Sequence, residues 1–353
     1  MIHNPKLTRQ VVIGSVAIGG GAPISIQSMT KTDTIDVPST VAQILALQRA
    51  GCELVRLAVL NEEAAQCLSA IRGQVSIPLI ADIHFDYKLA LMAIAGGIDA
   101  LRINPGNIGA TWKVKEVVNA CKDKAIPIRI GVNAGSLPKD ILKEHGGPTP
   151  EAIVQSATRH IDILRELDFG LIKVSLKASN VPMTVEAYEQ FSARYDYPLH
   201  IGISEAGPPS TGIIKSAVGL GILLQEGIGD TMRVSLTAPP QEEVRVAYEI
   251  LKALGIRQHG INLVSCPTCG RTRVDLLKLV EEAQNRLAVI DRDITVAIMG
   301  CEVNGPGEAK EADYGIASGT GMGLLFKKGH LVGRVPEASL IDALIELIKE
   351  DGA

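Results

Sequence analysis

Aromatic residues are scarce in this sequence of 353 residues. It has one Trp, six Tyr and four Phe, too few to form the stacking platforms that bind single-stranded nucleic acid. Neither sign of charge dominates the sequence. It has 35 basic and 39 acidic residues, and its net charge is −4. This balance counts against a protein that binds polyanions over its whole surface.

Long hydrophobic runs are also absent. The best apolar stretch, residues 213–224, is interrupted by Lys215 and Ser216, whereas a membrane-spanning helix needs about 20 apolar residues. No charged segment followed by an apolar one opens the sequence, so no secretory signal is predicted. Because 46% of the residues are hydrophobic, we expect a globular, cytoplasmic protein with an ordinary core.

The first two thirds of the chain repeat one unit, a helical segment followed by a Gly-containing turn and a short β-rich run. Eight such runs occur, at residues 24–29, 54–59, 78–83, 100–103, 126–130, 171–176, 199–203 and 232–236. Helical spacing lies between most of them, for example at 39–50, where Ser39 or Thr40 is the expected N-cap. Strands that alternate with helices over roughly 250 residues predict a parallel, TIM-type (β/α)₈ barrel.

An open, doubly wound sheet is the alternative fold. The first strand is not followed by Gly-x-Gly-x-x-Gly, which counts against a dinucleotide-binding fold. Beyond residue 261 the pattern changes to a small α+β arrangement that contains three cysteines. We therefore predict a substrate-binding barrel over residues 1–258 and a smaller domain over 259–353. A Gly-tipped hairpin at 11–21 is expected to plug the bottom of the barrel.

Polar residues follow the predicted barrel strands where the active site of a TIM-type barrel lies, at the carboxyl ends. Guanidinium and ammonium groups that converge there suit the oxygens of a diphosphate. For any single Arg, pairing with a carboxylate on the outer helices is an equal alternative. The candidates are Arg56, Asp82, His84, Arg102, Arg129, Asn133, Lys177 and Glu205.

Three of these candidates have more than one possible role. Asp82 and His84 face the same way because they are two residues apart on one strand. They form a metal pair, an acid–base pair or part of a polar substrate shell. Glu205 is a candidate proton donor, or it holds a neighbouring cation in place.

Cysteine supplies a second group of candidates. Cys266 and Cys269 form a close pair, and Cys301 follows in the same domain. Three thiolates suit a soft metal, and since this domain has no fourth cysteine, Glu302 or Glu308 is the candidate fourth ligand. An iron–sulfur cluster held in this way has one weakly bound iron that is open to substrate. A structural zinc site and a thioredoxin-like redox pair are the alternatives.

Together these motifs resemble the bacterial 4-hydroxy-3-methylbut-2-enyl diphosphate synthases of the methylerythritol phosphate route to isoprenoids. The resemblance covers essentially the whole chain, and the length matches the short, two-domain form of that family. The motifs that carry it are VAIGG at 16–20, IQSMT at 26–30, ADIHF at 81–85, RINPGN at 102–107, SEAG at 204–207, SCPTCGR at 265–271 and MGCEVNGPGE at 299–308.

The resemblance implies a TIM-type barrel and a C-terminal domain that binds one 4Fe–4S cluster. The implied substrate is 2-C-methyl-D-erythritol 2,4-cyclodiphosphate, which the enzyme opens and dehydrates with two electrons. The implied cluster ligands are Cys266, Cys269, Cys301 and Glu308. The implied contacts of the diphosphate are Arg56, Arg102, Arg129 and Lys177, with Asp82, His84 and Asn133 nearby.

Two catalytic roles and two kinds of partner also follow from the resemblance. Glu205 is expected to protonate the departing hydroxyl, and Asn304 is expected to orient the substrate near the open iron. Members of the family are homodimers in which the cluster domain of one chain caps the barrel of the other. Reduced flavodoxin or ferredoxin supplies the electrons.

Two other functions are compatible with the residues alone. The first is a cofactor-free barrel lyase or transferase that acts on a phosphorylated substrate and has a C-terminal domain stabilised by a structural zinc ion. The second is a zinc-dependent interaction module on a barrel scaffold. A pterin-binding transferase is related at the level of the barrel, but that function leaves the C-terminal cysteines unexplained.

Overall fold

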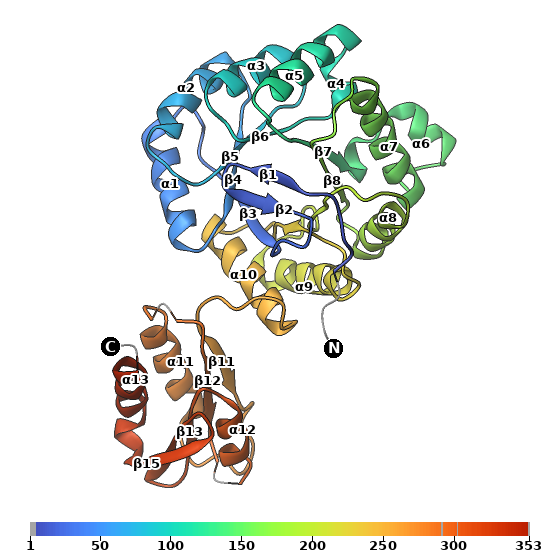
Figure 1. The fold of residues 1–353 in the computed structure, drawn as a ribbon. Helices are drawn as coiled ribbons and strands as arrows, with labels where there is room; N and C mark the ends of the chain where they lie inside the picture. The colour runs from blue at the N-terminus through green and yellow to red at the C-terminus, as the bar shows by residue number, and fades with distance from the viewer. Residues whose placement is uncertain (1–4, 291, 302, 352–353) are drawn as a thin grey trace. The chain divides into compact units, whose positions relative to one another are not determined.

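The structure is a computed structural model that describes residues 5–290, 292–301 and 303–351. It divides into two compact units, Met1–Ile256 and Arg257–Ala353 (Figure 1). The division lies two residues before the boundary predicted at 258/259. Within the described residues, no helix combines the length and hydropathy that crossing a bilayer requires.

The first unit is a parallel barrel, which confirms the predicted fold class. Its strands lie in the order β8-β7-β6-β5-β4-β3-β10-β9, and a bridge between Val174 of β8 and Leu199 next to β9 completes the ring. The strand bounds are β3 Ser25–Met29, β4 Leu54–Ala58, β5 Leu79–Asp82, β6 Ala100–Arg102, β7 Ile128–Asn133, β8 Ile172–Lys177, β9 His200–Ile201 and β10 Thr231–Met232.

Helices surround the barrel and cover its outward apolar residues (Figure 1). The first helix begins at Val37 because the side chain of Asp36 accepts the N–H of Ser39 at 3.1 Å. The N-cap predicted at Ser39 or Thr40 was therefore wrong, since both residues lie inside the first turn. The helix bounds are α1 Val37–Arg49, α2 Glu62–Arg72, α3 Tyr87–Ala95, α4 Pro105–Ile108, α5 Thr111–Asp123, α6 Lys139–Glu144, α7 Pro150–Glu166, α8 Val181–Arg194, α9 Pro209–Gln225 and α10 Pro240–Ala253.

A hairpin of β1 (Val11–Ile13) and β2 (Val16–Ile18) closes one end of the barrel. Its side chains Val11, Ile13 and Ile18 pack against Leu54, Ile80 and Ala100 inside the barrel. The hairpin turns at Gly14, whose φ is +57° and where an added Cβ would lie 2.8 Å from Pro78. The predicted plug is confirmed.

The second unit is a five-stranded sheet with helices on both faces. Strands β11, β12 and β13 are parallel, and β14 and β15 continue the sheet antiparallel. Along β12, Val296 and Ile298 pack on the side of α11 and α13, while Ala297 and Met299 pack on the side of α12. The bounds are β11 Asn262–Ser265, α11 Leu276–Leu287, β12 Thr295–Met299, α12 Gly305–Glu311, β13 Tyr314–Ser318, β14 Met322–Lys327, β15 His330–Pro336 and α13 Leu340–Glu350.

Candidate active site

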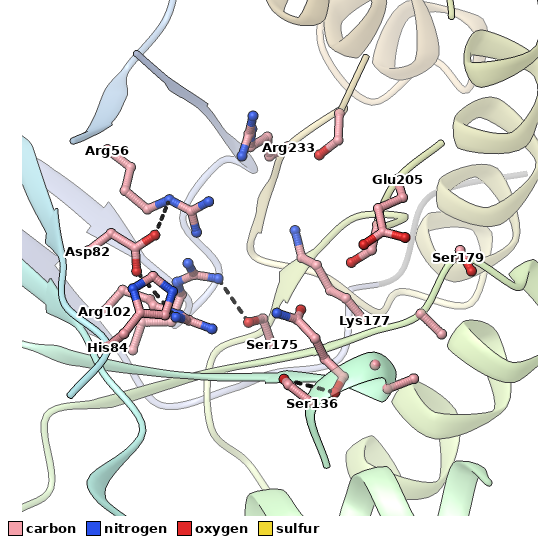
Figure 2. Close-up of a pocket in the computed structure, with 17 residues that line it drawn as sticks. Arg56, Asp82, His84, Arg102, Ser136, Ser175, Lys177, Ser179, Glu205 and Arg233 are labelled. Atoms are coloured by element: carbon pink, nitrogen blue, oxygen red, sulfur yellow. Dashed lines mark hydrogen bonds and ion pairs between the residues drawn. The ribbon is translucent and has the colours of Figure 1, made fainter. Parts of the chain in front are cut away.

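A cavity of about 460 Å³ opens at the carboxyl ends of the barrel strands (Figure 2). We call it the anion pocket, because five cationic side chains and only two carboxylates line it. The structure brings together all eight barrel residues that were predicted as site candidates. They are Arg56, Asp82, His84, Arg102, Arg129, Asn133, Lys177 and Glu205.

Asp82 lies between two guanidinium groups. Its Oδ2 is 3.5 Å from Nε of Arg56, and its Oδ1 is 3.3 Å from Nη1 of Arg102. Burial alone raises the pKa of Asp82, but the fields of Arg56, Arg102 and Arg129 outweigh burial and hold the pKa below its usual value. Asp82 is therefore an ionised residue that fixes the two guanidinium groups, which favours a place in the substrate shell over proton transfer.

Two glycines make room for the cations. Nη2 of Arg102 donates to the carbonyl oxygen of Gly131 at 2.8 Å, and a Cβ on Gly131 would lie 2.5 Å from Nε of Arg102. A Cβ on Gly202 would lie 2.5 Å from Nζ of Lys177. Both side chains therefore keep their positions only because the neighbouring strand carries glycine at these points.

Arg129 and Lys177 are buried in the pocket wall, at 3% and 8% exposure. Nη1 of Arg129 donates to Oγ of Ser175 at 2.8 Å, whereas its Nε and Nη2 have no hydrogen-bond partner among the residues that the structure describes. Burial lowers the pKa of both residues, and neighbouring cations lower it further. Buried donors without partners are the groups that an anionic ligand completes.

Glu205 lies on the opposite side of the pocket from Asp82 (Figure 2). It follows β9, its side chain is exposed, and its φ is +51°. A non-glycine residue in this left-handed region costs roughly 1 kcal/mol or more, and such strain collects at functional sites. Ala125, Asp168 and Lys328 adopt the same conformation outside both pockets, so the case for Glu205 rests on its place in the anion pocket.

Six further polar residues line the same cavity, and four of them belong to the polar residues that the sequence places at the ends of the predicted strands. Arg233 had an available signal, because it alternates with apolar residues on the predicted run 232–236. It is held at 3.2 Å by Glu243, a buried carboxylate on α10. Ser136, in a short 3-10 helix (Ala134–Ser136), and Ser179, in a loop, follow no periodic pattern that could have identified them. The six are Arg233, Ser136, Ser175, Ser179, Ser204 and Ser235.

A second cavity of about 390 Å³ lies in the C-terminal unit, and we call it the cysteine pocket. Cys266 directly follows β11, and Cys301 follows β12 after one glycine. Because these strands are parallel neighbours, their carboxyl ends bring the two thiols to one edge of the sheet. The pocket is lined by all five residues predicted for this domain, which are Cys266, Cys269, Cys301, Asn304 and Glu308.

The donors of the cysteine pocket suit a soft, positively charged group. Backbone N–H groups, that of Asn304 first, lower the pKa of Cys301, and the backbone N–H of Arg271 lowers the pKa of Cys269. The N–H of Gly300 donates to Sγ of Cys266 at 3.4 Å. These contacts favour thiolates, the form that binds iron. The residues present therefore fit an iron–sulfur cluster.

Two further observations concern the ligand set. In the described part of the chain, no three His, Cys, Asp or Glu side chains are grouped so that they could hold a metal ion. The four candidate ligands instead line the wall of the pocket. Glu302, the other carboxylate considered, lies outside the described residues.

Two protein families match the chain, one for each unit. The family described as GcpE TIM-barrel domain matches residues 8–248, and the family described as GcpE protein C-terminal domain matches residues 262–350.

Curated relatives match over nearly the full length. A protein of Thermodesulfovibrio yellowstonii, named 4-hydroxy-3-methylbut-2-en-1-yl diphosphate synthase (flavodoxin), is 59% identical over 345 residues, which is 98% of this chain and 99% of the relative. A protein of the same name from Geobacter sulfurreducens is 61% identical over 343 residues, which is 97% of each chain.

Solved structures with the same barrel include dihydropteroate synthases. The enzyme of Yersinia pestis has a TM-score of 0.51 at 11% identity, over 70% of this chain and 98% of that chain. The enzyme of Xanthomonas albilineans has a TM-score of 0.50 at 12% identity, over 71% and 99%. At this identity the likeness shows the barrel fold alone.

Proposed function

The chain belongs to the GcpE family, and on that premise we propose how its two pockets carry out one reaction. It converts 2-C-methyl-D-erythritol 2,4-cyclodiphosphate to 4-hydroxy-3-methylbut-2-enyl diphosphate in the methylerythritol phosphate pathway. The conversion consumes two electrons and one proton, breaks a ring C–O bond to phosphate and releases one water. The observation that carries the assignment is the near-complete match to enzymes of this name, supported by a pocket lined with five cations.

The anion pocket binds and activates the diphosphate. Arg56, Arg102, Arg129 and Lys177 are the proposed contacts of its oxygens, with His84 and Asn133 beside them. When the ring opens, the phosphate oxygen that leaves carbon gains negative charge. Fixed guanidinium groups stabilise that charge most effectively because they are already oriented before the reaction. Arg233 shares this wall and is proposed to take part in the same binding.

Glu205 is the proposed proton donor to the departing hydroxyl. It faces the anion pocket and is the second of the two carboxylates there, after Asp82. Asp82 is fixed in ion pairs to Arg56 and Arg102, whereas the side chain of Glu205 is exposed and has no ion-pair partner in the part of the chain that the structure covers. This difference supports Glu205, and not Asp82, in acid catalysis.

The cysteine pocket is the proposed site of a 4Fe–4S cluster held by Cys266, Cys269, Cys301 and Glu308. A bound cluster supplies the two electrons and a Lewis-acidic iron. The three thiolates fix the group firmly, and the carboxylate of Glu308 is the ligand most readily displaced. Asn304 lines the same pocket and is proposed to orient the substrate there.

Reduced flavodoxin is the proposed electron donor, because the relatives carry that carrier in their names. Among the three cysteines, Cys269 is exposed, Cys266 is intermediate and Cys301 is buried. Electrons therefore enter most directly through the side of Cys269. A cytoplasmic location, expected from the sequence, agrees with such a carrier.

A homodimer is the proposed assembly. Helix α9 carries three large apolar side chains on one face, at spacings of four residues, and they are exposed by 63%, 50% and 41%. These are Ile214, Val218 and Ile222. Such a stripe on an outer barrel helix is typical of a protein–protein contact, and a second copy of this chain is the partner that the family resemblance implies.

Anaerobic purification followed by iron, sulfide and zinc assays tests the cluster. About four irons and four sulfides per chain are expected, together with reductive turnover of the cyclodiphosphate. Stoichiometric zinc without sulfide, in protein never exposed to air, would contradict the redox function. The barrel lyase with a structural zinc ion would then be the better description.

A further inference from the structure

The interior of the barrel below the anion pocket is polar on one side. Outward residues of β8 such as Val174 and Leu176 belong to the hydrophobic shell, while the inward Ser175 and Lys177 line the pocket. Lys173 is the next inward residue below them. The buried inward residues under this part of the pocket, which we call the lower tier, are Ser25, Gln27, Lys173, His200 and Thr231.

Strand pairing places the lower tier in one continuous patch. Thr231 of β10 is in register with His200 on one side and with Ser25 on the other. Lys173 is in register with Arg129 of the neighbouring strand β7. None of the five side chains is more than 1% exposed. The patch therefore extends to Arg129 in the wall of the anion pocket.

The side-chain polar atoms of the lower tier have no hydrogen-bond partners in the described ranges of the chain. This holds for Nζ of Lys173, for both ring nitrogens of His200 and for both amide atoms of Gln27. Each such group costs about 1 to 3 kcal/mol when buried without a hydrogen bond, and barrel interiors are normally filled by branched apolar residues. The apolar side, with Leu54, Ile80 and the hairpin, follows that rule. The lower tier departs from it, which points to a functional reason.

Lys173 faces more positive than negative charge. The cations that act on it are Arg129 of β7 and Arg56 of β4, and the titratable His200 lies nearby on β9. The nearest carboxylate is that of Asp230, before β10. Its two oxygens accept from the hydroxyl of Thr8 and from the N–H of Leu199, each at 2.7 Å. No carboxylate of the described residues lies within 4 Å of Nζ of Lys173.

These surroundings favour the neutral amine in the free enzyme. Burial first, and Arg129 next, lower the pKa of Lys173 well below its usual value. A dianionic ligand above the lower tier reverses this preference, because its charge offsets the repulsion from Arg129. Arg129 connects the two levels, since it is in register with Lys173 and donates to Ser175 at 2.8 Å.

We propose that Lys173 is an ionisable floor of the anion pocket, which takes up one proton from solvent when the diphosphate binds above it. The inference rests on the proposed function, because it takes the cyclic diphosphate as the ligand. Lys173 is then a positioning residue whose ammonium charge is present only when substrate is bound. The free enzyme avoids adding another full positive charge to a buried group of arginines.

Calorimetry of substrate binding tests this proposal. The cyclodiphosphate is titrated into oxidised holoenzyme, without reductant, in buffers of different ionisation enthalpy at one pH near neutrality. The ligand itself releases or takes up no proton there, because each of its phosphates has lost its only acidic proton. Wild type is expected to take up protons, and Lys173→Met is expected to take up fewer, by as much as one per site. Its Kd should rise about tenfold, as expected for the loss of one unit charge across a polar interior.

Three further variants keep the result interpretable. Gln27→Met removes a buried polar group of the same tier that cannot titrate, so its proton uptake should equal that of wild type. Lys173→Arg carries a permanent charge, so it should bind with near wild-type Kd and take up fewer protons. Lys177→Met also lowers uptake if Lys177 titrates, and its effect should add to that of Lys173→Met.

The Tm is a second readout, because the proposal and a purely structural role for Lys173 predict changes of opposite sign in the Tm of Lys173→Met. Lys173→Met replaces a buried amine without a partner by an apolar side chain of similar length, which should raise the Tm of the barrel. A merely structural lysine would lower the Tm and leave proton uptake unchanged. Uptake in Lys173→Met equal to that of wild type would overturn the proposal. Absence of any binding heat in wild type would instead count against the proposed function itself.

Discussion

The carboxylate of Asp82 lies 3.3 Å from the guanidinium of Arg102, and both side chains are buried in the pocket wall. Asp82 also faces Arg56 at 3.5 Å. Asp82→Asn removes the negative charge between the two guanidinium groups, so buried Arg102 and half-buried Arg56 lose their ion-pair partner. We expect the barrel to lose about 3 kcal/mol of unfolding free energy. Urea unfolding, followed by the fluorescence of Trp112, the single tryptophan, measures it.

The same ion pairs give the barrel a pH dependence in acid. The folded-state pKa of Asp82 lies below its value in the unfolded chain. The stabilisation is therefore complete above the unfolded pKa, near pH 4, and is lost as the pH falls through the folded pKa. The difference in unfolding free energy between wild type and Asp82→Asn should be constant from about pH 7 to 5 and should shrink below about pH 4. A difference that grows in acid would contradict the assignment.

Glu205→Gln separates acid catalysis from binding. Removal of the proton donor should lower kcat by roughly 10² to 10⁴ and leave the absorption spectrum of the cluster unchanged. Glu205→Gly removes the same carboxylate and relieves the strain at φ +51°, so it should be equally slow but about 1 kcal/mol more stable. Normal turnover by Glu205→Gln would exclude this residue from proton transfer.

Gly131→Ala tests whether the position of Arg102 matters for binding. The added Cβ would lie 2.5 Å from Nε of Arg102 and force the guanidinium to move. We expect KM for the cyclodiphosphate to rise about tenfold, the equivalent of one lost charge-assisted hydrogen bond. Gly135→Ala is the matched control, because Gly135 lines the same pocket and its added Cβ meets nothing within 4 Å. Equal effects of the two changes would contradict the steric explanation.

Cluster binding should depend on the three thiols of the cysteine pocket. Cys269→Ser is expected to abolish the iron and sulfide content of anaerobically purified protein, since a serine hydroxyl is a poor ligand for iron. Glu308→Gln should retain a cluster that loses iron more readily, because the thiolates remain. Cys121→Ala is the control. Cys121 is buried in the barrel, and burial raises the pKa of its thiol to about 12.

The barrel could be predicted from the sequence because each strand lies between a periodic helix and a turn. The β-rich runs 54–59 and 171–176 match β4 and β8 to within a residue at each end. The predicted run 199–203 is longer than the strand that the structure shows, β9. Only His200 and Ile201 form a strand there, and Leu199 adds a single bridge to Val174 of β8. Local pattern locates a strand, whereas the partner strand determines its length.

The site was predicted where side chains project from strands and missed where they project from loops. Arg102 and Lys177 lie at strand ends, so alternation indicates which way they point. Ser136 lies in the short 3-10 helix after β7 and Ser179 lies in a loop, and the path of both segments depends on tertiary packing. The burial of the lower tier could not be predicted for a different reason. Lys173 and His200 look like ordinary polar residues in sequence, and only the structure shows that they are buried without partners.

The hairpin that plugs the barrel affects how the protein is made. Val11, Ile13 and Ile18 leave the ribosome first, yet the residues they pack against extend to Ala100. The pairing of β3 with β10 is delayed even longer, because β10 begins only at Thr231. At about 5 to 20 residues per second, roughly ten to forty seconds separate the synthesis of these two strands. A nascent chain with an open sheet edge for that long is a natural client for ribosome-associated chaperones.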